Sequence, residues 1–314
     1  MSARRVMRAA VVTSFGGPES VRIVPAEVPE PGEGEVRIKV AAAALNPVDA
    51  AVREGVFGGA GRTLGLGWDV AGVVDAVGPG AAAGGAVSPG AAAGWGVGDE
   101  VVALQYGMIK PLGTHAEYVV VPAGAVARAP RTADAVRAAT LPLNALAAAR
   151  ALDLLAPAPG SSLLVTGAAG AVGGYAVQLA ALRGVKATGL ARRGDEESVR
   201  SLGAADFVSG EPAAGDFDAV LDAAVLGGRA VSWVRDGGAY AGLIPTAVPG
   251  AERGVRVSGV EVAADGARLA ELVRLVEEGR LTLRVAGTYA LDDAAEAHAR
   301  LARGGLRGRL VLVP

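Results

Sequence analysis

A Gly-rich turn between an apolar strand pattern and an Ala-rich helix pattern constrains this chain more than any other segment. Residues 161–180 read SSLLVTGAAGAVGGYAVQLA, and a second strand pattern follows at residues 186–191. Glycine and alanine let a backbone turn sharply and approach a ligand, and the N-terminus of the following helix offers unpaired N–H groups to a pyrophosphate. With a strand before it and a helix and second strand after it, the turn predicts a dinucleotide site and therefore redox chemistry. The predicted cofactor contacts are Thr166, Gly167, Ala168, Ala169, Gly170, Ala171, Val172 and Gly173.

The end of the second strand predicts which dinucleotide binds. A site that prefers NAD usually has an acidic residue about 20 positions after the Gly-rich turn. Ala191 stands at that place, and Arg192 and Arg193 follow it. Because a carboxylate would repel a 2′-phosphate and guanidinium groups bind one, we predict NADPH as the cofactor, held by both arginines. The alternative is a solvated basic turn, and nearby Asp195 is a complication.

Composition excludes several classes of function. The 314 residues have a formal net charge of −2, 4% aromatic residues, no cysteine and two histidines. These values predict no nucleic-acid partner, no disulfide, no thiol catalysis and no His-rich zinc site. No apolar run approaches a membrane span, and residues 9–12 are too short for a signal sequence, so we expect a cytoplasmic protein with no membrane partner.

The pattern of the chain changes near residue 124. Before it, short strands alternate with Gly- and Pro-rich turns, and residues 79–98 form a low-complexity segment that we interpret as a surface loop. After it, helix and strand patterns alternate, which is typical of a parallel sheet covered on both faces. The tail returns to the first style. We therefore predict an α/β protein, with a β-rich domain at residues 1–123 and 265–314 and a doubly wound nucleotide-binding domain at residues 124–264.

The predicted elements follow from these patterns. The first part has strands at residues 8–12, 21–28, 35–43, 69–77, 100–104 and 116–121, and a helical patch at 46–55. The second part has helices at 133–155, 172–183, 196–202 and 226–234, and strands at 161–167, 186–191, 206–209, 218–224, 238–243 and 255–262. The tail has helices at 267–278 and 292–302, and strands at 284–290 and 309–313.

Six short motifs occur in a characteristic order. They are Asn46-Pro47-Val48-Asp49 with Arg53 and Gly55, GWDVAG at 67–72, VGDEVV at 97–102, AEYVVVP at 116–122, VTGAAGAVG at 165–173 and GRLVL at 308–312. In this order the chain resembles the medium-chain dehydrogenase/reductase superfamily, and most of all its zinc-independent quinone oxidoreductase and enoyl reductase branch. The resemblance covers nearly the whole chain. It implies a GroES-like catalytic domain and a Rossmann domain, with the active site in the cleft between them.

The resemblance also assigns candidate site residues. Zinc-bearing members have a histidine where this chain has Trp68, and they use cysteines, so we expect no metal. The substrate-pocket candidates are Arg53, Phe57 and Trp68. The further cofactor candidates are Asn144, Asp222, Gly242, Leu243 and Arg309. Asn144 is equally compatible with a helix cap, and Arg53 with an ion pair.

A bound nicotinamide carries the hydride, so the protein must stabilise the developing oxyanion and supply a proton. The candidates for these tasks are Asn46, Asp49, Tyr106 and Lys110. Asn46 and Asp49 could instead cap a helix, and Lys110 could be a solvated surface lysine. The family tyrosine corresponds to Phe57, which cannot donate a proton. His115 and His298 are expected to be structural.

These features predict an NADPH-dependent reductase of quinones or α,β-unsaturated carbonyls that acts on a small-molecule substrate. Two alternatives stay open: a pathway-specific enoyl reductase or cyclisation enzyme of secondary metabolism, and an NADPH-binding sensor or structural protein with little turnover. The apolar strand at residues 255–262 could pair with its copy across a two-fold axis, which predicts a homodimer.

Overall fold

The computed structural model describes residues 5–81 and 94–314, and the chain divides into two compact units. The β unit comprises Met1–Leu143, Ala264–Glu278 and Leu283–Pro314, and the α/β unit comprises Asn144–Ala263 and Gly279–Thr282. The first boundary thus lies at residue 143, whereas the sequence pattern placed it at 123. Most of the predicted low-complexity loop lies outside the described residues.

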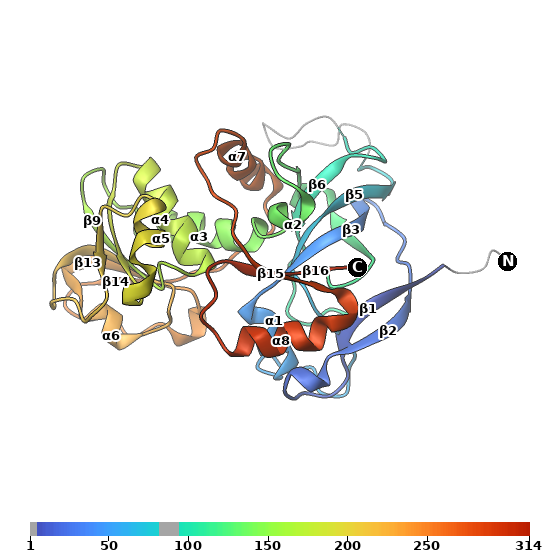
Figure 1. Cartoon of the computed structure of the whole chain (residues 1–314), viewed down its shortest axis with the longest axis horizontal. Coiled ribbons are helices and arrows are strands. Elements are labelled where there is room, and N and C mark those ends of the chain that lie inside the picture. Colours follow the sequence, from blue (N-terminus) through green and yellow to red (C-terminus); the bar gives the residue numbers. More distant parts are fainter. Residues whose placement is uncertain (1–4, 82–93) are drawn as a thin grey trace. The chain divides into compact units, whose positions relative to one another are not determined.

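Two sheets build the β unit (Figure 1). A three-stranded antiparallel sheet has the order β2-β1-β4, and a seven-stranded sheet has the order β15-β16-β3-β5-β6-β8 with β7 paired to β3. The strands are β1 (Val6–Val12), β2 (Arg22–Glu27), β3 (Glu35–Leu45), β4 (Leu64–Gly65), β5 (Asp69–Val77), β6 (Glu100–Leu104), β7 (Tyr118–Pro122), β8 (Val126–Arg128), β15 (Val285–Ala290) and β16 (Arg309–Val313).

The helices of the β unit pack on these sheets. They are α1 (Pro47–Arg53), α2 (Ala135–Ala138), α7 (Gly266–Glu277) and α8 (Ala294–Ala302). Buried Leu269, Leu272, Val273 and Val276 form the apolar stripe of α7, and the side chain of Asp265 caps this helix by accepting a hydrogen bond from the backbone N–H of Arg268. α1 and α8 share one apolar cluster with β1, β3, β4 and β16. This packing fixes α1, whose N-terminal turn carries two candidate site residues.

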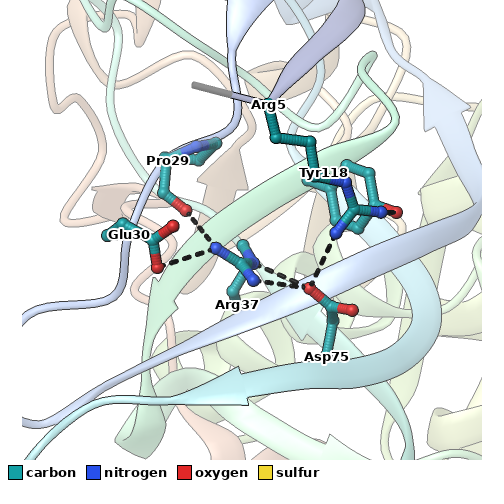
Figure 2. A network of polar contacts seen from close by, with 6 residues as sticks. All are labelled: Arg5, Pro29, Glu30, Arg37, Asp75 and Tyr118. Atoms are coloured by element: carbon teal, nitrogen blue, oxygen red, sulfur yellow. Dashed lines mark hydrogen bonds and ion pairs between the residues drawn. The ribbon is translucent and has the colours of Figure 1, made fainter. Parts of the chain in front are cut away.

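A buried arginine contacts residues of two strands that neighbour its own in the β unit (Figure 2). Arg37 of β3 has a largely buried side chain, and its guanidinium pairs with Asp75 of β5 at 2.8 Å. The same group donates to the carbonyl oxygen of Pro29 at 3.0 Å, and it lies 5.9 Å from the ring centroid of Tyr118 on β7. Arg5 also contacts this ring. Because the planar fork of arginine can satisfy several acceptors at once, this one side chain links β3 to β5 and to the segment before β3.

The α/β unit is one six-stranded parallel sheet with the order β11-β10-β9-β12-β13-β14. Its strands are β9 (Ser162–Thr166), β10 (Lys186–Leu190), β11 (Asp206–Val208), β12 (Phe217–Asp222), β13 (Val234–Gly242) and β14 (Arg256–Gly259), and its helices are α3 (Pro142–Leu155), α4 (Ala171–Leu182), α5 (Glu196–Ser201) and α6 (Gly228–Val231). The chain order reverses between β9 and β12, which lie side by side at the centre. In open parallel sheets, ligands bind at the carboxyl ends of the strands at such a reversal.

The structure corrects three of the predicted elements. The helix predicted at residues 226–234 is only α6, Gly228–Val231, and Val234 already belongs to β13. The helix predicted at residues 133–155 is two helices, α2 and α3, because Pro142 cannot continue a helix and begins a new one instead. The strand predicted at 238–243 begins at Val234 and ends at Gly242. Short β4 and β8 had no pattern of their own. They form because longer neighbours, β1 and β6, supply the pairing partners.

One segment, Ala135–Leu155, is long and apolar enough to cross a membrane by length and composition, although 78% of its most apolar window is buried inside the fold. Core helices of globular proteins pass the same test. Its burial here agrees with a core helix.

Candidate functional site

The Gly-rich turn of the α/β unit connects β9 to α4. Gly167 begins it with φ +59°, a left-handed conformation that glycine adopts without steric cost. Gly170 is the N-cap of α4 in an extended conformation, and its N–H donates to the carbonyl oxygen of Gly167 at 2.8 Å. The turn is therefore tight, and the first helical N–H groups of α4 follow it directly.

Gly173 lets α4 approach this turn. A Cβ atom at this position would lie 2.3 Å from the carbonyl oxygen of Gly167 and 2.9 Å from the Cα of Ala168. Real Cβ atoms do not approach so closely, so any side chain would push the helix away from the turn. The close approach of helix and turn is the geometry that dinucleotide-binding turns require, so the residues present fit a dinucleotide.

A buried hydrogen-bond network fixes the carboxyl ends of the central strands. Thr166 Oγ1 donates to Asp222 Oδ1 at 2.7 Å, and the Tyr240 hydroxyl donates to Asp222 Oδ2 at 2.8 Å. Burial, together with this bond to a carboxylate, raises the pKa of Tyr240. Thr166, Asp222 and Tyr240 belong to β9, β12 and β13, so the network ties three adjacent strands.

The same network holds the loop that follows β12. Thr166 Oγ1 accepts the N–H of Ala224 at 2.9 Å, and Asp222 Oδ2 accepts the N–H of Gly227 at 2.8 Å. Between these two anchors Val225 has φ +57°, which is costly for a β-branched residue. Such strain persists only where surrounding bonds enforce it, and it gathers at ligand-binding loops. Both carboxylate oxygens of Asp222 are thus used inside the protein, to position the strand ends.

Arg192 and Arg193 lie just after β10, where the sequence placed them. Both side chains are exposed, and neither guanidinium has a hydrogen bond or ion pair with any residue that the structure describes. By contrast, Arg200 on α5 pairs with Glu196. Ala191, the position at which the sequence pattern predicts an acidic residue in an NAD site, directly precedes them. This edge of the sheet therefore presents two uncommitted cationic groups.

The remaining cofactor candidates are divided between the units. Asn144 lies buried in the first turn of α3 and belongs to the α/β unit, as do Gly242 at the end of β13 and half-buried Leu243. Arg309 lies in β16 of the β unit, and its charge acts on the buried carboxyl of Asp69. Arg309 therefore contributes to the polar cluster of the β unit.

That polar cluster begins at the N-terminus of α1. Asp49 is fully buried, and its two oxygens accept the N–H groups of Asn46 at 2.8 Å and Gly67 at 2.7 Å. Gly67 has φ +97°, and a Cβ on it would lie 2.4 Å from the N atom of His115. Asp49 therefore acts as half of a helix capping box and as an anchor for the loop before β5, as the capping alternative predicted.

Asp69, at the start of β5, is a second buried carboxyl in this cluster. It accepts the Asn46 side-chain amide at 2.5 Å and the backbone N–H of Leu143 at 2.5 Å. Burial raises its pKa to about 7, against the lowering effect of both hydrogen bonds. The sequence reasoning did not single out Asp69, although its place inside the GWDVAG motif could have indicated a role.

Lys110 lies in the loop between β6 and β7, and it is buried, with 9% of its surface exposed. Its Nζ donates to the carbonyl oxygen of Gln105 at 3.0 Å and lies 4.8 Å from the ring centroid of Trp68. Burial lowers its pKa to about 8. Trp68 is itself buried and meets Tyr106 edge to face, with ring centroids 5.4 Å apart. The solvated-lysine alternative is therefore wrong.

The other candidates of the β unit have distinct surroundings. Arg53 is buried, donates to the carbonyl oxygen of Gly16 at 3.1 Å and pairs with Glu54, which is the ion-pair alternative. Its Nη1 lies 3.4 Å from Nδ1 of His298. Phe57 is 37% exposed, which leaves its ring open to a ligand or to solvent.

Within residues 5–81 and 94–314, no group of three or more His, Asp or Glu side chains is placed to hold a metal ion.

Two family models match the chain. An alcohol dehydrogenase GroES-like domain matches residues 32–131, and a zinc-binding dehydrogenase domain matches residues 193–312. The NADPH-dependent alkenal/one oxidoreductase of Arabidopsis thaliana is 32% identical to the chain, over 98% of this chain and 80% of its own. The chain belongs to the medium-chain dehydrogenase/reductase superfamily. Relatives of this kind place it in the quinone oxidoreductase and enoyl reductase branch of that superfamily, which confirms the resemblance drawn from the motifs.

Solved structures agree with this family. The quinone oxidoreductase from Coxiella burnetii superposes with a TM-score of 0.85 at 25% identity, covering 99% of this chain and all of its own. A structure described as an NAD-dependent alcohol dehydrogenase superposes with a TM-score of 0.83 at 31% identity, covering 98% of this chain. The predicted α/β fold class, with a GroES-like part and a Rossmann-type parallel sheet, is confirmed. This medium-chain dehydrogenase/reductase is an oxidoreductase.

Proposed function

We propose that this oxidoreductase uses NADPH to reduce a quinone or an α,β-unsaturated carbonyl, without zinc. The names of the relatives support the acceptor class, since they include alkenal/one and quinone oxidoreductases. The observation that carries the cofactor preference is the pair of exposed guanidiniums, Arg192 and Arg193, that lack partners among the described residues while Ala191 replaces the acidic residue.

The α/β unit has the groups that this cofactor requires. The tight turn at Gly167–Gly173 would receive the pyrophosphate, and the two arginines would bind the 2′-phosphate through charge-assisted hydrogen bonds. When bound, the reduced nicotinamide supplies the hydride. Thr166, Asp222 and Tyr240 would keep the strand ends and the β12 loop in a fixed position, so that little ordering is left for the binding step.

The absence of zinc is proposed from the donor set. Catalytic zinc uses about three protein ligands, most often His, Cys or carboxylate. The chain has no cysteine, and Trp68 stands where the zinc-bearing relatives have histidine. The nearby carboxyls of Asp49 and Asp69 already accept hydrogen bonds from protein groups on both oxygens. Metal analysis of the purified protein by mass spectrometry tests this point, and stoichiometric zinc that supports turnover would contradict it.

Steady-state kinetics tests the cofactor assignment. The double variant Arg192→Ala/Arg193→Ala should raise the KM for NADPH by about tenfold or more, because each charged hydrogen bond contributes about 1.5–3 kcal/mol, and should leave the KM for NADH nearly unchanged. The matched control is Arg200→Ala, which removes an exposed arginine of the same unit that already has a partner. An unchanged preference between NADPH and NADH in the double variant would refute the assignment.

The acceptor class is tested by NADPH oxidation with 9,10-phenanthrenequinone and 2-cyclohexenone. Turnover of either supports the proposed activity. Tight NADPH binding without oxidation by any acceptor of a broader panel would instead favour a pathway-specific enzyme or a nucleotide-binding protein with little turnover.

We also propose a homodimer, since β14 is the edge strand of the parallel sheet and its outer backbone groups have no strand partner within the described chain. Size-exclusion chromatography that shows a monomer at micromolar concentration would contradict it.

A further inference from the structure

The ammonium group of Lys110 has an incomplete set of hydrogen-bond partners. A protonated lysine carries three N–H donors, and a buried one is normally paired with a carboxylate. Lys110 is buried, with only 9% of its surface exposed. Among the residues that the structure describes, its Nζ nevertheless has one hydrogen bond, to the carbonyl oxygen of Gln105. The ring of Trp68 covers another side of the cation.

The two carboxylates near Lys110 do not complete this set. Asp49 and Asp69 are close enough to influence the charge on Lys110, yet no oxygen of either lies within ion-pair distance of Nζ. Asp49 accepts two backbone N–H groups, and Asp69 accepts the Asn46 amide and the Leu143 N–H. Each of these oxygens already accepts one hydrogen bond from another donor, and Lys110 lies near both carboxyls without a direct contact to either.

A cation in this state suits an oxygen that develops negative charge. Its burial strengthens electrostatic interactions, and its remaining N–H donors are available at no cost in broken protein bonds. Tyr106, whose ring meets that of Trp68 edge to face, is 55% exposed and extends the aromatic surface of Trp68. The cluster of Lys110, Trp68 and Tyr106 thus combines an oxyanion donor with an aromatic wall.

Building on the proposed function, we propose that the Lys110 ammonium binds the carbonyl oxygen of the acceptor and protonates it as the reduction proceeds. Lys110 is therefore the acid that replaces the tyrosine missing at Phe57, and the acceptor class is an enone or quinone whose carbonyl lies beside an apolar or aromatic body.

The step balances as follows. A bound reduced nicotinamide would supply the hydride to the β-carbon of the enone, and the C=C electron pair would then move to form an enolate. An N–H bond of Lys110 breaks as its proton moves to the enolate oxygen, which gives an enol and a neutral amine. The enol becomes the ketone by taking a proton from water at the α-carbon and losing one from oxygen, and the amine recovers its proton from solvent. The net reaction consumes one reduced nicotinamide and one proton.

Binding of 4-nitrophenolate, an aromatic oxyanion, tests the site without turnover. We expect the wild-type protein to bind it and Lys110→Met to lose about tenfold or more in affinity, as expected for loss of a charged hydrogen bond. The control is Lys39→Met, because Lys39 is exposed on β3. Equal affinity in wild type and Lys110→Met would overturn the proposal.

Amine labelling of the wild-type protein gives a readout that requires no variant. The chain has only three lysines, Lys39, Lys110 and Lys186, of which the first and last are exposed. With acetic anhydride followed by peptide mass spectrometry, 4-nitrophenolate should slow acetylation of Lys110 and leave the other two unchanged. Unchanged labelling at Lys110 under saturating phenolate would also overturn the proposal.

Kinetics separates this proposal from the proposed function. If the enzyme is active, kcat/KM of wild type should fall above about pH 8 as Lys110 loses its proton, and Lys110→Met should be slower and lack this limb. Asp49, Asp69 and His115 are the other titratable groups that act on this lysine. If the activity is unchanged in Lys110→Met, the proposed role of Lys110 is refuted but the proposed oxidoreductase function is not. An inactive wild type that still binds phenolate through Lys110 refutes the oxidoreductase assignment and leaves the oxyanion site intact.

Discussion

Buried His298 should make the free energy of unfolding of this protein depend on pH, and the substitution His298→Gln should remove that dependence. His298 lies on α8, almost without exposure, with Nδ1 3.4 Å from Nη1 of Arg53. Burial, with added repulsion from the positive charges of His115 and Arg53, lowers its pKa from 6.5 to about 3. His115 is the only other histidine of the chain, and burial lowers its pKa as well.

The sign follows from proton uptake on unfolding. Between the two pKa values the unfolded chain carries a proton on His298 and the folded chain does not, so falling pH favours the unfolded state. The stabilising contribution is thus fully present above pH 6.5 and is lost as pH falls toward 3. At 1.36 kcal/mol for each pKa unit, lowering the pH from about 7.5 to about 5 should cost about 2 kcal/mol through His298.

Asp69 should act in the opposite direction. Its folded-state pKa is raised from 3.8 to about 7, so the folded chain retains a proton that the unfolded chain has lost. This contribution is present below pH 3.8 and is lost as pH rises through 7, and it adds about 2 to 3 kcal/mol at pH 5 relative to pH 7.5. The wild-type profile should therefore be flat with respect to these two groups, because one effect hides the other.

Urea unfolding of His298→Gln at both pH values separates them. The glutamine keeps a polar group beside Arg53 and cannot titrate. Its destabilisation relative to wild type should be about 2 kcal/mol larger at pH 7.5 than at pH 5. Asp69→Asn is the control with the opposite sign, because its destabilisation should be larger at pH 5. A cost of His298→Gln that is equal at both pH values, within about 0.5 kcal/mol, would refute the reasoning.

Three further substitutions test the architecture. Gly173→Ala should lower NADPH affinity in calorimetric titration by about tenfold or more and reduce stability by about 1–3 kcal/mol, since its Cβ would lie 2.3 Å from the Gly167 oxygen. The control Gly228→Ala, with open space around its Cβ, should change neither the NADPH affinity nor the melting temperature. Tyr240→Phe should lose about 1–2 kcal/mol in urea unfolding, and a neutral result would show that Asp222 does not depend on this hydroxyl. Arg37→Met should lose about 2–3 kcal/mol because it removes the 2.8 Å ion pair of Asp75 and leaves that carboxylate only Arg5 at 3.9 Å. A smaller loss than in Arg200→Ala, whose ion pair is exposed, would contradict the importance of burial.

Local patterns were enough to predict the strand–turn–helix that the structure has at residues 162–182. The turn at Gly167–Gly173 needs only residues that are adjacent in sequence, and its backbone requirements exclude most side chains. Arg192 and Arg193 were found in the same way, by their position after β10. In both cases the strand–turn–helix order fixes the position of the residues, so the sequence alone is sufficient to predict that position.

The networks around Asp222 and Lys110 depended on contacts that sequence order does not show. Asp222 joins Thr166, 56 residues away, because parallel pairing places their strand ends side by side. Whether a lysine in a loop is solvated or buried depends on what packs over it, and here Trp68 from another segment does so. No local pattern could distinguish these cases, so the sequence left the solvated surface position of Lys110 open as an alternative.

The sequence by itself determined the family, the parallel sheet and the tight Gly-rich turn before α4, because these follow from periodicity and short motifs that act over a few residues. Only the tertiary structure decided that Asp49 and Asp69 are buried with a hydrogen bond to each oxygen, that Asp222 joins three strands, and that Lys110 is a buried cation with one hydrogen bond. Burial and hydrogen bonding depend on segments that meet only in the folded chain, and they set the charge state and reactivity of each group.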